Sequence, residues 1–217
     1  MSHHTLTARK RAIRDITIAH GSHPSLEAGA CVMELVAYVA GEPWSDHPQC
    51  ASKVIAAFLR GWNDGMDDED RQMLRPFIPR LVNTAGTPAQ EKTRSWMALD
   101  WYCRVSAPAW LRAAHLDAEA AAIEATAPII DSKSAKAAQN ALNAASAKAR
   151  AAGAAAWDAA WAAAWAAAWD AARDAAGNAA RAAARDAAGA AAGNALRPTV
   201  VALQKSALDL VERMLTA

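Results

Sequence analysis

Apolar residues recur three and four positions apart along most of the chain, the spacing that places them on one face of an α-helix. Residues 26–40 follow this spacing, with Ser25 as the expected N-cap and Gly41 as the expected stop. A second apolar stripe covers residues 54–62 and ends at the turn sequence NDG. Both segments are therefore predicted to be helices with one buried face.

The start of a later helix is predicted by a capping-box pattern. Thr87 can accept a hydrogen bond as the N-cap, Pro88 suits the first helical position, and Gln90 stands three residues after the cap. Only residues 16–18, which are β-branched, hint at a strand. Because a lone strand has no partner elsewhere in the chain, this stretch is expected to be the frayed end of a helix.

Composition changes at about residue 111, where a mixed sequence gives way to alanine-rich segments. The change predicts a compact helical N-terminal module over residues 1–111. Residues 112–217 are predicted to form long alanine-rich helices packed as hairpins or a bundle, with joints at Pro128, Gly153 and Pro198 and an amphipathic helix over 203–215. The fold class that follows is all-α.

From Trp157 the sequence divides into four-residue units that end in two alanines in every unit but the last. A spacing of four advances each lead residue by about 40° around a helix. The four tryptophans then form a fan of about 120°, opposite a face of charged residues. The members of this Trp face are Trp157, Trp161, Trp165 and Trp169.

An aromatic stripe of this kind usually packs inside its own chain. If it is exposed, it suits a protein partner or self-association, because tryptophan anchors interfaces. A membrane surface is less favoured, since the polar face carries equal acid and base, and an ice-binding surface would need a regular threonine column.

Charge and cysteine content limit the functional classes further. The 23 basic and 22 acidic residues give a net charge of +1, which provides no overall attraction for nucleic acid or an anionic membrane. No specific nucleic-acid partner is expected, and any such binding would need a local patch. Three cysteines and no apolar signal sequence indicate a cytoplasmic protein. Residues 151–169 contain too much alanine, and an aspartate, for a membrane span.

Two short pairs of possible metal ligands flank the helix predicted over residues 26–40. His20 and His23 form one pair, and His47 and Cys50 form the other, at spacings that let both members of a pair reach one metal. Together they could form a zinc site, with Cys31 as an alternative ligand. The competing interpretation is structural, because His23 and His47 each precede a proline and so lie at turns.

A cysteine nucleophile is a further possibility in the same segment. Cys31 or Cys50 would supply the thiolate, His47 the base, and Asp46 or Glu34 the carboxylate that orients it. These residue types suffice for the chemistry, but the sequence does not place them within hydrogen-bond distance of one another.

The stretches GACVMELVAYVAGEPWSDHPQC, VIAAFLRGWNDG and LRPFIPRLVNTAG resemble an uncharacterised group of actinobacterial and actinophage proteins. The resemblance covers residues 20–86, and the tail is similar mainly in composition. Members often carry a second cysteine at the position of Ser52. The resemblance implies a phage-related setting and no particular activity.

The expected function is that of a non-enzymatic helical binding or scaffolding protein acting through helix surfaces, with the Trp face as the interaction surface. The alternative is a metal- or cysteine-dependent enzyme centred on residues 20–50.

Overall fold

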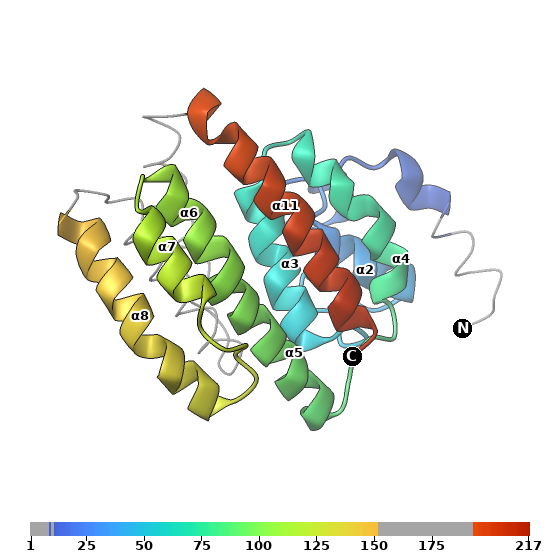
Figure 1. Ribbon diagram of the computed structural model, residues 1–217. Coiled ribbons are helices and arrows are strands. Elements are labelled where there is room, and N and C mark those ends of the chain that lie inside the picture. The colour runs from blue at the N-terminus through green and yellow to red at the C-terminus, as the bar shows by residue number, and fades with distance from the viewer. Residues whose placement is uncertain (1–8, 10, 152–192) are drawn as a thin grey trace. The chain divides into compact units, whose positions relative to one another are not determined.

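The computed structural model describes Arg9, residues 11–151 and residues 193–217. The described residues form helices joined by turns and contain no strand, which confirms the all-α class (Figure 1). Among these helices, none combines the length and the apolar character that crossing a membrane requires. The alanine-rich tract with the Trp face lies outside the described residues, so its predicted helix and the joint at Gly153 stay predictions.

Two compact units divide the chain, residues 1–91 and residues 92–217. The change in composition at residues 111 and 112 falls inside helix α6 (Ala107–Ala113). Composition and packing therefore change at different points of the chain.

The first unit includes the short 3-10 helix η1 (Ile13–Asp15), after which Ile16 is extended and residues 17–19 belong to no helix or strand. The expected frayed helix end at residues 16–18 is therefore wrong. The side-chain amide of Gln72 replaces a partner strand: Ile18 N donates to its Oε1 and its Nε2 donates to Ile18 O, both at 3.0 Å. Ile18 is fully buried, so its backbone groups need these partners.

The helix predicted over residues 26–40 is interrupted. Residues Leu26–Ala28 form the 3-10 helix η2, and the α-helix α2 runs only from Val32 to Ala40. Ser25 precedes η2 but its side chain makes no capping hydrogen bond, and the N-cap of α2 is Cys31. Between them Gly29 has φ +130°, a conformation that ends η2 and that L side chains rarely adopt. The predicted stop is confirmed, because Gly41 is left-handed at φ 75°.

Helix α3 (Lys53–Gly65) carries the predicted apolar stripe, and its buried residues include Val54, Ile55, Phe58 and Leu59. The expected stop at the sequence NDG is wrong, because these three residues form the last turn of α3. It is followed by the 3-10 helix η3 (Asp70–Phe77) and the single-turn helix α4 (Ile78–Leu81). Helices α3 and α4 both pack against α2, whose apolar side chains are almost all buried. Helix α2 is thus the central helix of the first unit.

Helix α5 (Pro88–Trp101) starts with the predicted capping box. Gln90 N donates to Thr87 Oγ1 at 3.3 Å, and Thr87 N donates to Gln90 Oε1 at 3.0 Å. The helix continues through the π-helix η4 (Tyr102–Ser106) into α6. Because Pro108 has no N–H to donate, the backbone widens there, and Ala107 N donates five residues back to Tyr102 O.

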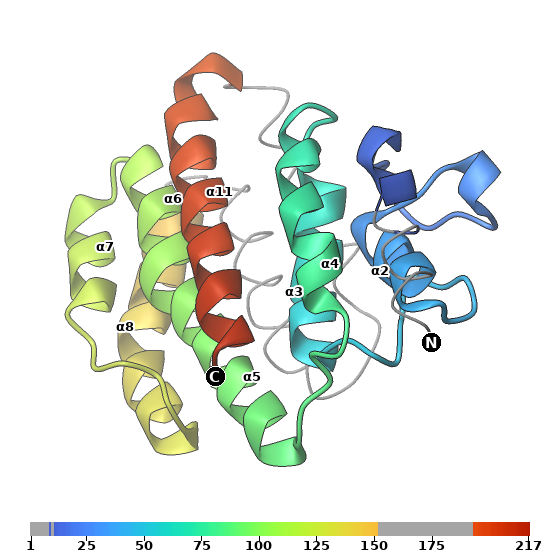
Figure 2. The same ribbon diagram turned by 90° about the vertical axis from the view of Figure 1, so that its right-hand side faces the viewer.

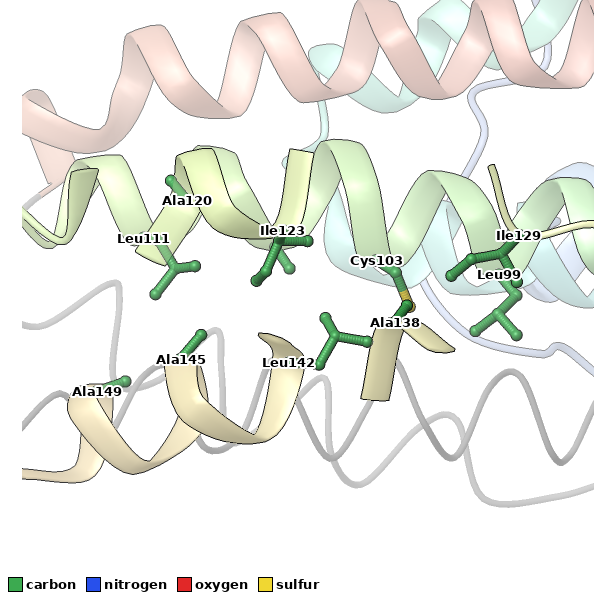
Figure 3. Packing of buried hydrophobic residues seen from close by; sticks show 11 residues of the cluster. Leu99, Cys103, Leu111, Ala120, Ile123, Ile129, Ala138, Leu142, Ala145 and Ala149 are labelled. Carbon is green, nitrogen blue, oxygen red and sulfur yellow. The ribbon is translucent and has the colours of Figure 1, made fainter. Parts of the chain in front are cut away.

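Helices α6, α7 (Asp117–Glu124) and α8 (Ser132–Ala151) lie side by side, and α7 packs against both α6 and α8 (Figures 1 and 2). The predicted joint at Pro128 is confirmed, because it lies between α7 and α8. Figure 3 shows the core that these helices share with α5 and η4. Helix α8 contributes Ala138, Leu142, Ala145 and Ala149 to this core. Three of these four residues are alanines, so the backbone of α8 can come close to its neighbours.

Helix α11 (Gly193–Leu215) closes the second unit and packs against α6. Its amphipathic character is confirmed by the buried residues Leu203, Ala207, Leu210, Val211 and Met214. Two polar contacts tie it to α5: Trp101 Nε1 donates to Ser206 Oγ at 2.8 Å, and Arg94 Nε donates to Met214 O at 3.0 Å. The joint predicted at Pro198 is wrong, because this proline lies inside α11, near its start.

Candidate functional site

The carboxylate of Glu34 is the centre of the richest polar cluster in the first unit. Its side chain is 1% exposed, in the first turn of α2. Glu34 Oε1 accepts from His23 N at 2.5 Å, and Glu34 Oε2 accepts from Cys31 N at 2.7 Å. His23 Nδ1 lies 3.0 Å from Oε2. A buried carboxylate needs such partners, and these contacts join the loop at His23 to the start of α2.

Two further contacts fix the position of His23, one to its backbone and one to its imidazole ring. Trp44 Nε1 donates to His23 O at 2.7 Å, which anchors the backbone of the loop. The imidazole lies against Gly29, where an added Cβ would come within 2.5 Å of His23 Cδ2. Gly29 is thus required twice, by its positive φ and by the space that the ring occupies.

Cys31 serves as the N-cap of α2. Its Sγ accepts from Glu34 N at 3.4 Å, while the Glu34 side chain accepts from Cys31 N, so the pair forms a capping box with cysteine in the place of serine. Burial raises the pKa of the Cys31 thiol to about 12, and the nearby Glu34 charge acts in the same direction. The thiol is therefore protonated at neutral pH and is a poor nucleophile.

The three side chains Cys31, His23 and Glu34 are the residue types of a nucleophile, a base and an orienting acid. Their arrangement differs from that of a catalytic triad, because both Cys31 and His23 bind the same carboxylate. Among the described residues no hydrogen bond joins His23 to Cys31. The contacts that the three residues do make join the loop at His23 to the start of α2.

The other residues of the predicted sites lie elsewhere. His20 is exposed at a turn. His47 Nδ1 lies 2.6 Å from Asp46 Oδ1 on the surface, which brings together the predicted base and its orienting acid. Cys50 is half-buried, and burial followed by the charge of Glu42 raises the pKa of its thiol. Neither Cys31 nor Cys50 is therefore activated as the thiolate that the nucleophilic hypothesis requires.

The five predicted metal ligands do not come together around one point. All five candidate ligands, His20, His23, Cys31, His47 and Cys50, lie in the part of the chain that the structure describes. Within that part, no group of three or more histidine, cysteine, aspartate or glutamate side chains is arranged to hold a metal ion. His23 and Cys31 meet at a carboxylate, and His47 pairs with Asp46.

A second polar cluster was not expected from the sequence. The amide of Asn63, fully buried in α3, accepts from Val32 N at 3.1 Å and donates to Ala19 O at 2.9 Å. Arg71, 1% exposed, donates to Asn63 O and Met66 O at 2.7 and 2.6 Å. These contacts hold the segment at residues 16–19 against α2, α3 and η3. Nothing in the sequence indicated this role for Asn63 and Arg71, because Asn63 binds backbone atoms of residues that are distant in the sequence.

The predicted interaction surface, Trp157, Trp161, Trp165 and Trp169, lies outside the described residues. Comparisons with models of protein families, with curated proteins and with solved structures found no match.

Proposed function

We propose that the protein is a non-enzymatic helical binding or scaffolding protein. It would act through the surfaces of its alanine-rich helices, with the Trp face at residues 157–169 as the main contact. The phage-related, cytoplasmic setting belongs to this proposal and rests on the resemblance over residues 20–86 and on the cysteine content.

The proposal rests on one observation: the cysteine, histidine and glutamate side chains that could react are engaged in contacts that hold helices and loops together. Glu34 accepts hydrogen bonds from His23 and Cys31, and the Cys31 thiol caps a helix with a pKa raised to about 12 by burial. The buried Cys103 thiol in the second unit has its pKa raised to about 12 for the same reason, with a contribution from Asp100. These groups stabilise helices and loops, which is what a scaffold requires of them.

The composition of the second unit supports a role for helix surfaces. Helices α7 and α8 expose alanine as well as bury it, for example Ala121, Ala122, Ala137 and Ala144. Large exposed tryptophans against such a background would be distinct anchors, since aromatic residues contribute most to interfaces. A second copy of the chain is the partner to test first, because it needs no unknown protein.

The test compares the wild-type protein with a variant in which Trp157, Trp161, Trp165 and Trp169 are all changed to phenylalanine. Sedimentation velocity is measured over a hundredfold range of concentration. We expect the wild-type protein to self-associate and the variant to dissociate at concentrations at which the wild type does not. The control changes Trp62, Trp96 and Trp110, which lie in the described part of the chain, to phenylalanine and should leave the association unchanged.

The difference in fluorescence between the wild type and the tract variant reports the emission of the four tract tryptophans. Blue-shifted emission in a protein that stays monomeric throughout would show that they pack inside their own chain, and would overturn the proposal. Stoichiometric zinc, iron or manganese in protein purified without a histidine tag would favour the alternative enzyme instead.

A further inference from the structure

Helix α8 presents one face of lysine, asparagine and alanine side chains to solvent. The residues that point into the core occupy one side of the helix, and those on the other side are exposed. At about 100° per residue, the exposed side chains that follow the first residue, Ser132, cover about 140° of the circumference. They are Lys133, Lys136, Ala137, Asn140, Asn143, Ala144, Ala147 and Lys148. We call this set the lysine–asparagine face.

The charge on α8 is of one sign. From residue 132 to residue 151 the sequence has three lysines and one arginine and no acid. The acid that is nearest in the sequence, Asp131, precedes the helix, and its carboxylate accepts a hydrogen bond from Ser134 N at 2.7 Å. Lys133 and Lys136 lie in the first turns, where the helix dipole disfavours cations. These two lysines therefore make the electrostatic potential positive at the start of α8, although they lower the stability of the helix.

We propose that the lysine–asparagine face binds duplex DNA. The overall charge of +1 does not favour nucleic acid, but a local cationic patch can do so where it is exposed. Interfaces with proteins are enriched in aromatic and other large apolar residues at their centre, whereas interfaces with DNA are polar and positive. The face has no apolar side chain larger than alanine, and therefore matches DNA better.

The dimensions of α8 also suit a duplex. Lys133 and Lys148 are 15 residues apart, which is about 22 Å along the helix axis. The short side chains of Ala137, Ala144 and Ala147 keep the exposed face narrow, and the major groove of B-form DNA is about 12 Å wide. The deep and narrow major groove of A-form RNA would not admit the helix.

The side chains of the face divide into two roles. The lysines are suited to phosphate oxygens, which give affinity without reading sequence. Along the helix axis Asn140 and Asn143 lie between Lys136 and Lys148, and an asparagine amide can pair with the edge of adenine. The proposal therefore includes a preference for sites that contain adenine, lost when the two asparagines are changed.

The experiment measures fluorescence anisotropy of a labelled duplex of about 20 base pairs titrated with the full-length protein. If the three lysines contact phosphates, affinity should fall about 40-fold between about 50 mM and about 200 mM monovalent salt. Changing Lys133, Lys136 and Lys148 to glutamine should remove most of this salt dependence and weaken binding at low salt. Changing Asn140 and Asn143 to alanine should reduce the preference for adenine and leave the salt dependence unchanged.

The matched control changes Lys53, Lys92 and Lys205 to glutamine. These lysines are exposed on α3, α5 and α11, and their loss changes the net charge by the same amount. Equal weakening by the control and the α8 variant would overturn the proposal, since it would show a response to net charge alone. Binding of a polyglutamate peptide through the α8 lysines, with no binding of duplex DNA, would overturn it in favour of an acidic protein partner. Both outcomes are independent of the tryptophan variants, so failure here would leave the proposed function standing.

Discussion

His23 and Glu34 are joined twice, by a hydrogen bond from the backbone and by a contact from the ring. His23 N lies 2.5 Å from Glu34 Oε1, and His23 Nδ1 lies 3.0 Å from Glu34 Oε2. The two residues are eleven positions apart, on either side of η2 and the Gly29 turn. This double contact sets the loop before α2 against the start of that helix, and the carboxylate also caps the helix through Cys31 N.

Replacing Glu34 should therefore destabilise the first unit strongly. Glu34→Gln keeps the size of the side chain but replaces one carboxylate oxygen by an NH₂ group. That group would face His23 N or Cys31 N, which are both donors and need an acceptor. Loss of one partner of a buried charged hydrogen bond costs about 3 kcal/mol. The free energy of unfolding, measured by denaturant titration, should fall by about this amount. Glu69→Gln, on an exposed acid, should change it by less than about 0.5 kcal/mol.

Gly29→Ala should also destabilise the protein. The new Cβ would lie 2.5 Å from the His23 ring, at a backbone φ of +130°. We expect a loss of about 2 kcal/mol or more in the free energy of unfolding, because the conformational strain and the clash act together. Gly65→Ala is the matched control: no atom lies within 4 Å of the added Cβ there, so stability should stay equal or rise slightly.

A double variant separates the clash from the strain. His23→Ala removes the ring that meets the Cβ, so Gly29→Ala should cost less in that background than in the wild type. An equal cost in both backgrounds would show that the clash contributes nothing.

The three thiols should differ in reactivity. Cys50 is half-buried, whereas Cys31 and Cys103 are buried and have pKa values raised to about 12 by burial. Because the thiolate is the reactive form, alkylation with iodoacetamide at pH 8 should modify Cys50 first. Peptide mass analysis over time can follow each site, and in urea the rates should become similar. Early modification of Cys31 in the folded protein would contradict its burial and protonation.

Alkaline pH should weaken the fold through the same two thiols. Their pKa is about 12 in the folded protein, against 9.0 for an unperturbed thiol. As pH rises above about 9 the unfolded chain loses these protons first, so the free energy of unfolding falls until pH passes about 12. Cys103→Ala should reduce the slope between pH 9 and pH 11, whatever it costs at neutral pH. Urea titrations at a series of pH values measure this slope.

The core of the second unit depends on one large side chain in α8. Leu142 is 1% exposed among alanines, on the face shown in Figure 3. Leu142→Ala should lower the free energy of unfolding by about 2 to 5 kcal/mol, because it leaves a cavity. Asn143→Ala changes the adjacent exposed residue and should have little effect. A small effect of Leu142→Ala would mean that α8 is not held to α6 and α7 through this core.

Local patterns were enough to predict several parts of the fold. The spacing of apolar residues predicted α3 and the stripe on α11, and Thr87 with Gln90 predicted the start of α5. Each of these signals is contained within one or two helical turns. The helix over residues 26–40 was predicted too long, because apolar periodicity continued across Gly29, where the backbone leaves the helix.

The candidate site was only partly predictable. The sequence indicated that the side chains of His23, Cys31 and Glu34 could take part in catalysis or metal binding. The pattern Cys31-x-x-Glu34 could also have been recognised as a capping box. It could not show that His23 and Cys31 share one carboxylate. That arrangement depends on how a loop folds back on α2.

By itself the sequence determined the all-α class and most helix positions, because helix periodicity and caps are local properties. It also determined the one-signed charge of α8, since the acids are absent from that stretch. Only the tertiary structure decided which polar residues are buried together, and which side of α8 faces solvent. Burial sets the pKa of Cys31 and Cys103, and it arises from contacts between segments that are distant along the chain.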